Sequence, residues 1–291
     1  MPNNLGRDQL WMPQVWADID KAVLDEVGSI RVVQKVFSST SMPNAANVPA
    51  DHFDPDAMKI DEGGTKPLIE ISVEFSLTQS QVDNEATLHT GRTLAKLAAK
   101  SLALAEDTLL LQGHEAKLPN NVKVINRQSA EQGLIGAGDG RDISVKPLDS
   151  GSGSAAVYGA GLFTAVTQGI AELNKKGQPG PYALLLESSV YADAFSPVAN
   201  TLVTTADRLT PLLTGGFYGT GALPKDTGLL ASLGGEPTTI YIGQDAVTAY
   251  TQEDGEGNYR FRVFERVQFV ARDKAAFVNM KFQAAARAAK A

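Results

Sequence analysis

Two segments alternate apolar and polar residues in the way that predicts a β-strand with one buried face and one wet face. The first covers residues 68–77, where isoleucine, valine, phenylalanine and leucine alternate with glutamate and serine, and the second covers residues 259–270. Between them, residues 85–112 change to helical spacing, with leucine and alanine on one stripe and Gly113 as the stop. A helix of this length runs about 40 Å, so it is the longest rigid element that the sequence predicts.

The N-terminal part predicts a helix, a strand and a long arm. Residues 14–27 place four apolar side chains at helical spacing, with charged residues on the opposite face and Gly28 as the stop. Residues 30–37 are rich in β-branched side chains and predict a strand. Residues 38–64 hold three prolines, two adjacent glycines and five acids against Lys59 alone. Because ordinary connections rarely exceed about 12–15 residues, we expect an exposed acidic excursion that is either a functional arm or disordered.

The rest of the chain predicts a second lobe. Residues 133–161 are rich in glycine and serine, and we expect a mobile linker between two lobes there. The periodicity then predicts helices at residues 162–176 and 190–195, strands at 182–187, 227–232 and 238–242, and an irregular stretch at 201–207. Residues 284–291 predict a short helical tail, because most of them are alanine.

Composition and charge narrow the class of protein. The 291 residues are 43% apolar and 20% charged, which suffices for one large or two modest domains. The 33 acids exceed the 26 bases, and a net charge of −7 argues against a general binder of nucleic acid or anionic membranes. The absence of cysteine excludes disulfides, thiolate metal sites and a cysteine nucleophile. The N-terminus lacks a signal-peptide pattern, and no apolar run reaches the roughly 20 residues that span a bilayer.

Catalytic and ligand-binding motifs are not found in the sequence. The three histidines, His52, His89 and His114, have no metal-ligand spacing, and Leu118 stands where a zinc-protease helix starting at His114 needs its second histidine. Gly159-Ala-Gly161 lacks the third glycine and the preceding strand of a dinucleotide fingerprint. We therefore predict no catalytic residue, no metal site and no resident cofactor, and the protein is not expected to be an enzyme.

Two acidic segments are candidates for holding a cation. Residues 253–258 lack the alternating oxygen ligands of a calcium loop, so we expect a hairpin turn before the strand at 259–270. The acids of residues 51–62 could hold a cation or face a basic surface of a neighbouring subunit, whereas the ordinary interpretation of such a segment is a solvated charged surface.

The order of these elements and several short motifs resemble one protein family. The motifs are Trp16-Ala-Asp-Ile-Asp20, Lys66-Pro-Leu-Ile-Glu70 with Phe75-Ser-Leu77, Ala105-Glu-Asp107 with Gly113, Gly180-Pro-Tyr-Ala-Leu184, Gly234-Gly235, Gly243-Gln-Asp245 and the strand from Phe264 to Phe269. Together they resemble the encapsulins, the family once called linocin-type bacteriocins, which share the fold of tailed-phage capsid proteins. Residues 133–161 are longer and looser than in that family, and residues 38–64 share little with it.

The resemblance implies an α+β, tailed-phage capsid-like fold with a peripheral domain, a spine helix, an extended E-loop and an apical domain. The N-terminal helix and the start of the peripheral domain are expected in residues 1–37, and the E-loop in residues 38–77. Residues 78–135 would supply the peripheral domain with the spine helix, and residues 136–250 the apical domain. Residues 251–291 would supply returning strands of the peripheral domain and a C-terminal tail.

The resemblance also implies a function, that of a structural shell protomer. Such a protomer assembles with itself into an icosahedral nanocompartment in the bacterial cytoplasm and encloses a cargo such as a peroxidase or a ferritin-like protein. Neither nucleic acid nor a membrane is an expected partner. Two alternatives stay open at this point: a major capsid protein of a phage or prophage enclosing DNA, and a soluble hydrolase with an unrecognised site.

Two groups of residues receive roles from the resemblance. Cargo peptides are expected to dock beside the N-terminal helix, in a groove at Trp16, Ile19, Val23 and Val27 with an ion pair from Arg31. The same apolar side chains are as well suited to holding the helix to its own domain. A pore for small substrates is expected in residues 197–211, where Asp207 and Arg208 would influence which ions pass.

Overall fold

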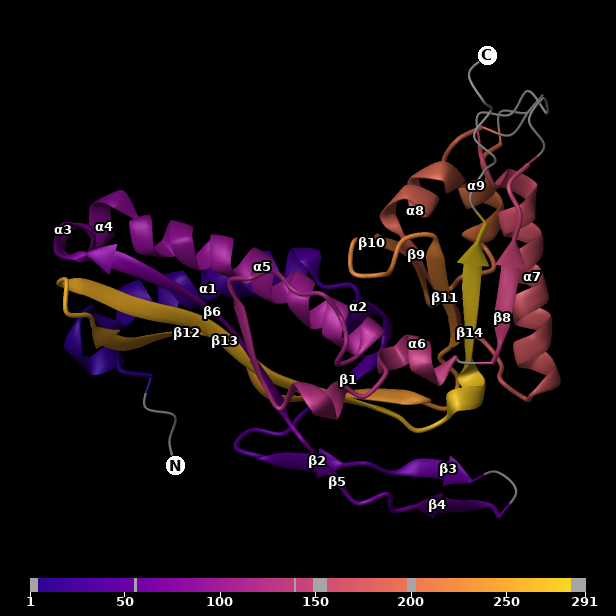
Figure 1. The fold of residues 1–291 in the computed structure, drawn as a ribbon, viewed down its shortest axis with the longest axis horizontal. Coiled ribbons are helices and arrows are strands. Elements are labelled where there is room, and N and C mark those ends of the chain that lie inside the picture. Colours follow the sequence, from indigo (N-terminus) through magenta and orange to yellow (C-terminus); the bar gives the residue numbers. More distant parts are fainter. Residues whose placement is uncertain (1–4, 55–56, 139, 149–155, 198–202, 284–291) are drawn as a thin grey trace. The chain divides into compact units, whose positions relative to one another are not determined.

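The computed structural model describes residues 5–54, 57–138, 140–148, 156–197 and 203–283, which form two compact units (Figure 1). The first unit contains those up to residue 35, together with 39–131 and 239–270. The second contains 36–38, 132–238 and those after 270. Each unit combines helices with a five-stranded sheet, which confirms the predicted α+β class.

The first unit is built on a sheet of strand order β1-β12-β13-β6-β7. Its strands are β1 (Ser38–Ser41), β12 (Thr238–Glu253), β13 (Asn258–Ala271), β6 (Ile69–Thr78) and β7 (Val122–Ile125). The two segments with clear alternation are β6 and β13, and they pair antiparallel with each other, from Ile69 opposite Val267 to Thr78 opposite Asn258. β12 ends at Glu253 and β13 begins at Asn258, so the predicted hairpin turn is also confirmed.

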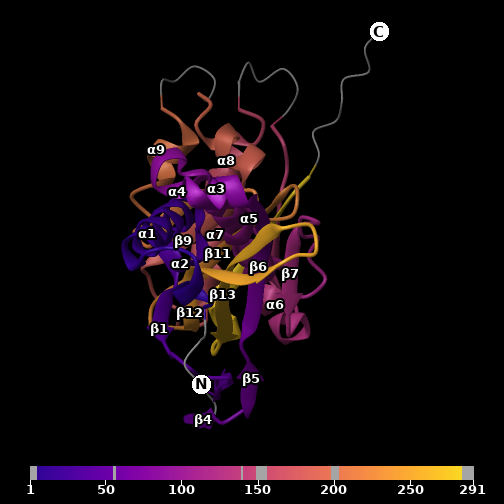
Figure 2. The same ribbon diagram turned by 90° about the vertical axis from the view of Figure 1, so that its left-hand side faces the viewer.

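Two helices, α1 (Pro13–Ile30) and α5 (Thr90–Gln112), pack against each other and against this sheet (Figures 1 and 2). Both were predicted from their apolar stripes. Trp16 of α1 contacts Leu77 of β6 and Phe261 of β13 in one buried cluster. Gly28 does not end α1, which continues to Ile30, because a helix packed along a partner tolerates one glycine at a cost of about 1 kcal/mol.

The strand predicted at residues 30–37 is wrong. The chain leaves α1 at Arg31 and forms a short helix, α2 (Val33–Val36). The buried carboxylate of Asp107 in α5 accepts hydrogen bonds from the backbone N–H groups of Val32 (2.7 Å) and Val33 (3.0 Å). These bonds supply the partners that the first N–H groups of a helix lack. A side chain 75 residues away along the chain therefore overrides the local β-propensity.

The start of α5 is fixed by a buried glutamate. The short helices α3 (Gln79–Asp83) and α4 (Glu85–Leu88) precede α5, and His89 separates α4 from α5 with φ of 51°. The Glu85 carboxylate accepts hydrogen bonds from the N–H groups of Gly91 (2.6 Å) and Arg92 (2.9 Å) in the first turn of α5. The predicted helix at residues 85–112 is thus two helices with a capped break between them.

The arm expected at residues 38–64 has regular structure. Its first residues, Ser38–Ser41, belong to the sheet as β1. The rest forms two two-stranded ribbons: β2 (Asn47–Pro49) pairs with β5 (Thr65–Pro67), and β3 (His52–Asp54) pairs with β4 (Lys59–Asp61). Figure 2 shows β5 continuing from the lower end of β6. Strands of three residues are too short to show alternation, so the sequence pattern did not predict them.

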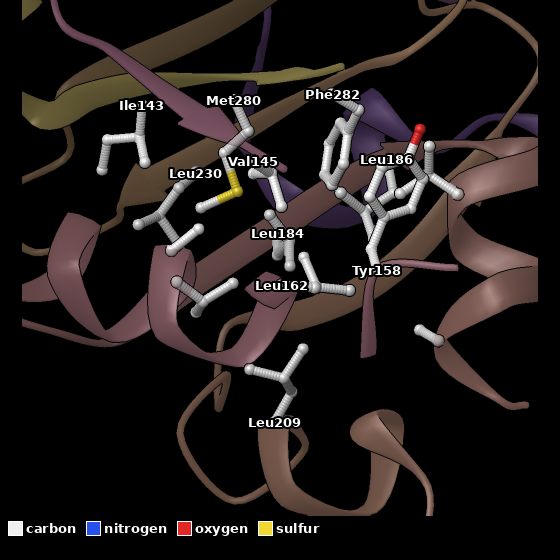
Figure 3. Close-up of a cluster of buried hydrophobic side chains, with 14 of the residues drawn as sticks. Ile143, Val145, Tyr158, Leu162, Leu184, Leu186, Leu209, Leu230, Met280 and Phe282 are labelled. Atoms are coloured by element: carbon white, nitrogen blue, oxygen red, sulfur yellow. The ribbon is translucent and has the colours of Figure 1, made fainter. Parts of the chain in front are cut away.

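The second unit has a sheet of strand order β10-β9-β11-β14-β8. Its strands are β10 (Gly216–Thr220), β9 (Tyr182–Glu187), β11 (Thr227–Ser232), β14 (Phe277–Phe282) and β8 (Asp142–Val145). The helices α7 (Gly159–Lys175), α8 (Ser188–Ala194) and α9 (Thr205–Leu209) share its core. Figure 3 shows Leu162 of α7 beside Leu184 of β9, in a cluster that also holds Leu230 and Met280.

The mobile linker predicted at residues 133–161 is wrong over the described residues. Gly133–Ala137 form α6, and β8 pairs in parallel with β14 through Ile143 and Val145, which point into the core. Residues 149–155 of that stretch lie outside the described residues, as does the tail predicted at 284–291. Three short 3₁₀ turns complete the elements: η1 (Arg7–Gln9), η2 (Arg127–Ala130) and η3 (Lys274–Ala276).

The roles that the resemblance assigns to the five expected domains remain predictions. β12 is shared by the expected segments 136–250 and 251–291, and all of it except Thr238 lies in the first unit up to Glu253. β14, in the expected segment 251–291, lies in the second unit. The chain therefore passes between the units at residues 35–39, 131–132, 238–239 and 270–271.

The capping role of Glu85 gives the first testable prediction. Glu85→Gln replaces one acceptor oxygen by an NH₂ group that faces a buried N–H donor, so we expect a loss of about 1–3 kcal/mol in the free energy of unfolding. Urea denaturation followed by circular dichroism measures it. Asp83→Asn, at an exposed position two residues away, is the control, and we expect a change within about 0.5 kcal/mol. Equal stability of both variants would contradict the capping role.

Candidate functional site

The four apolar residues assigned to a cargo groove lie inside the first unit. Trp16, Ile19, Val23 and Val27 are all buried against the sheet and α5. Trp16 packs on Trp11 with ring centroids 4.8 Å apart, and its Nε1 donates a hydrogen bond to the Arg7 carbonyl (3.1 Å). These side chains hold α1 in place and do not reach the surface of the subunit.

The outer side of α1 carries apolar side chains that do reach the surface. Leu24 is 41% exposed, and Met12, just before the helix, is 75% exposed. Glu26 lies between α1 and α5, where it pairs with Lys96 (3.1 Å) and Lys100 (3.4 Å) of α5. Both lysines lower the pKa of the Glu26 carboxyl. A peptide that docks beside α1 would meet this mixture of apolar and charged groups.

Arg31 is buried at the C-terminal end of α1 and binds acids from three other elements. It forms ion pairs with Glu106 of α5, with Asp245 of β12 (3.0 Å) and with Glu265 of β13. Gln34 of α2 donates a further hydrogen bond to Glu106 (2.6 Å). Burial raises the pKa of Glu106, although Arg31 opposes this effect. The residue predicted to meet a cargo peptide is therefore already surrounded by partners from its own chain.

The motif search did not identify the acidic partners of Arg31, although the sequence held a signal for Glu106 and Glu265. Glu106 and Asp107 interrupt an otherwise apolar stretch of α5 between Leu102 and Leu111. Glu265 occupies a position in β13 that the alternation predicts to be apolar, on the same face of the strand as Phe261 and Val263. A charged residue in a buried register needs a buried partner, and this rule points to an internal ion pair.

The arm carries exposed apolar side chains together with its acids. Met58 is 89% exposed and Ile60 is 60% exposed. His52 and Asp61 face each other across the ribbon of β3 and β4 at 3.4 Å. Within the described part of the chain each ribbon has two strands, so its outer edges present backbone groups that no further described strand pairs.

Asp207 and Arg208 lie on α9 in the second unit, next to residues 198–202, which lie outside the described residues. Asp207 forms a capping box with Thr204, whose N–H and hydroxyl donate to the carboxylate at 2.8 and 2.7 Å. These two bonds lower the pKa of Asp207. The Arg208 guanidinium lies 3.8 Å from the centre of the Phe163 ring. Both side chains are exposed, so the stretch predicted to be irregular ends in an ordered helical turn with opposite charges at its surface.

The described residues contain no group of three or more acids and histidines that could hold a metal ion. His52 lies on β3, His89 at the break before α5 and His114 just after α5, so the fold does not bring them together. Two hollows of about 310 and 290 Å³ lie one in each unit, and both are lined by charged side chains, several of them in ion pairs. No helix among the described residues is long and apolar enough to cross a membrane.

Comparison with known families gives a match over most of the chain. A family model described as encapsulating protein for peroxidase (Linocin_M18) matches residues 3–139 and 140–268. Curated relatives include a type 1 encapsulin shell protein of Mycolicibacterium paratuberculosis, 26% identical over 66% of this chain and 64% of the relative. Another is the type 1 encapsulin shell protein EncA of Myxococcus xanthus, 30% identical over 36% of each chain. The match thus spans less than two thirds of the length of either relative.

Solved structures share the fold. A virus-like particle from Pyrococcus furiosus matches with a TM-score of 0.68 and 15% identity, over 91% of this chain and 99% of that chain. The SrpI encapsulin of Synechococcus elongatus matches with a TM-score of 0.57 and 10% identity, over 87% and 90%. A chain of Mycobacterium phage Bobi also gives 0.57, at 15% identity, over 88% and 91%. The structural likeness confirms the capsid-like fold and does not separate encapsulins from phage capsids.

The family model favours encapsulins over phage capsids, because it matches almost all of the described chain and is described as an encapsulating protein for peroxidase. The curated relatives are likewise named as shell proteins, which agrees with the expected non-enzymatic role and leaves the hydrolase alternative without support. By the sequence of both of its units, this chain belongs to the encapsulin shell protein family.

Proposed function

We propose that copies of this chain close into an icosahedral protein shell in the bacterial cytoplasm and enclose a cargo enzyme. The arm is the observation that supports self-assembly most directly. Membership of the encapsulin family supports the same function, and the relatives are named for it. A phage capsid enclosing DNA is the weaker alternative, since it shares the fold but not the family.

The arm has too little core to be stable by itself. An isolated two-stranded ribbon is at best marginally stable in water, and this arm consists of two such ribbons in series. Val48 is the one fully buried arm residue in this cluster among the described residues, together with Leu68, Tyr241 and Val270, and Met42 and Ala45 are partly buried beside it at the base of the arm. Farther out, Met58 and Ile60 remain exposed. A second copy of the chain that covers these side chains and edges would supply the missing burial.

The proposed cargo is a peroxidase or a ferritin-like protein held by a short peptide. The description of the matching family supports a peroxidase. The docking site assigned to α1 remains a proposal. Because Trp16, Ile19, Val23, Val27 and Arg31 are buried, they would serve it by keeping α1 in position, and Leu24 and Met12 are the apolar groups that a peptide can touch. Weak binding at each site suffices, since many identical sites face a multimeric cargo.

The proposed pore lies around α9. Asp207 and Arg208 place opposite charges on an exposed turn of the second unit, and loops carried by a rigid lobe are common places for function. If several copies bring these turns around one axis, their charges would act on passing ions at short range.

Deleting the arm tests self-assembly. Removal of residues 44–62 takes out β2, β3 and β4 while leaving β1 and β6 in the sheet. We expect a subunit with nearly unchanged circular dichroism that no longer closes into shells in electron micrographs. The control is the double variant Asp51→Asn and Asp54→Asn, which removes negative charge from the arm while keeping its length. Intact shells from the deleted chain would contradict the role given to the arm.

A third prediction concerns cargo loading. Leu24→Ser should lower the cargo mass per shell without loss of shells, because it removes an exposed apolar contact and leaves the core of α1 unchanged. The neighbouring variant Asp25→Ser, which breaks only the exposed pair with Lys21, should load normally. Native mass measurement of shells made together with the cargo decides between them. Full loading of the Leu24 variant would exclude docking at this part of α1.

A fourth prediction separates the two pore charges. Asp207→Asn should speed the entry of an anionic dye or substrate, and Arg208→Gln should slow it, with both effects lost at about 1 M salt, where the Debye length is about 3 Å. Lys225→Gln, an exposed charge elsewhere in the second unit, is the control. Entry rates that do not differ between the three variants would remove the pore from this turn.

A further inference from the structure

Buried negative charge exceeds buried positive charge where α1 meets α5. Arg31 is the one cation in this cluster among the described residues, and it faces Glu106, Glu265 and Asp245. Asp107, next to Glu106, is also buried. From α2, Gln34 is neutral, and Lys35 points away to the Ser29 carbonyl at 2.8 Å. If all four acids were ionised, three negative charges would remain uncompensated, and only Asp245, whose side chain is 51% exposed, could be stabilised by water.

Such an excess is costly, and binding a proton removes part of the cost. An ionised carboxylate without a partner in a buried site loses its hydration, so the group becomes neutral instead. The cluster does not satisfy all of its buried oxygens: Oε2 of Glu265 pairs with Arg31, whereas Oε1 is buried and has no hydrogen-bond partner among the described residues. Burial raises the pKa of Glu106. Burial and the neighbouring Glu106 raise the pKa of Asp107 to about 7, despite the hydrogen bonds from Val32 and Val33.

We propose that this cluster is a proton-dependent latch that holds α1 in the first unit and loosens it as the pH rises. The latch consists of Arg31, Glu106, Asp107, Asp245 and Glu265. While one proton is bound, two ionised carboxylates among the three buried acids face one guanidinium, so one buried negative charge is uncompensated instead of two. When the proton is lost to solvent, two of the three buried negative charges lack a balancing cation, and movement of the end of α1 would let water reach them.

The direction of the pH effect follows from proton linkage. A carboxyl whose pKa is raised in the folded protein binds more protons when folded than when unfolded, so stability falls as the pH increases. For Asp107 this contribution is fully present below its ordinary pKa of 3.8 and is lost as the pH passes about 7. The inference goes beyond the proposed shell, because the latch lies within one subunit and its test needs no assembly.

The two tryptophans of the chain report on the attachment of α1 to the first unit. Trp16 near the start of α1 is buried, and Trp11 just before the helix stacks on Phe261 with ring centroids 5.1 Å apart. We expect the urea midpoint of tryptophan fluorescence to fall between pH 5 and pH 7 in the unaltered protein and to level off above about pH 8. Glu265→Gln keeps the shape of the side chain and removes one negative charge, so its midpoint should change much less over this range. Glu74→Gln, a surface variant on β6, should behave like the unaltered protein.

Two results would overturn the latch: a constant midpoint in the unaltered protein between pH 5 and 8, or a midpoint that falls equally in the Glu265 variant. If Glu265→Gln does not fold, infrared spectroscopy of the unaltered protein decides. We expect absorption of a protonated carboxyl group at pH 7 that disappears by pH 9. Its absence at pH 7 would mean that the cluster binds no proton, and the proposal would be wrong.

Discussion

The packing of α1 onto α5 and the sheet is the interaction on which the rest of the first unit depends. Apolar contacts of Trp16, Ile19, Val23 and Val27 bring the helix to the sheet, and such contacts do not by themselves fix its position along the sheet. Arg31 and Asp107 fix the position, because an ion pair and two N–H bonds form only in one arrangement. The buried charges thus contribute specificity more than stability, in the sense known for buried ion pairs.

The second constraint is the contrast between the well-packed units and the arm. In both units the central sheet strands carry many buried side chains, as in the cluster of Leu184, Leu230 and Met280. The arm has exposed edges and exposed Met58 and Ile60 instead. The exposed apolar side chains and strand edges of the arm therefore make it the segment suited to contact with another molecule. In a family of shell proteins, a second copy of the same chain is the natural candidate.

Elements with long local patterns could be predicted from the sequence, and those fixed by distant contacts could not. Strands β6 and β13 show alternation over ten or more residues, and α1 and α5 show helical stripes of similar length. The strand expected at residues 30–37 failed because Asp107 caps α2 from another helix. The linker expected at 133–161 failed because β8 has only four residues and is held by pairing with β14, more than 130 residues later.

The functional residues show the same division. The sequence assigned Trp16 to the N-terminal helix and Arg31 to a strand after it, and it could not show their burial, which depends on β12, β13 and α5. The resemblance to encapsulins came from short motifs in a particular order, and this type of signal survives when single motifs are too common to decide. Which side of α1 meets solvent could be read only from the structure.

The mass of the purified protein in solution tests the central claim most directly. If the arm joins copies of this chain into a closed container, mass photometry at neutral pH will show uniform particles in the megadalton range that electron microscopy reveals as hollow and round. A protein that remains a monomer of 30.8 kDa or a small oligomer under these conditions would contradict the account.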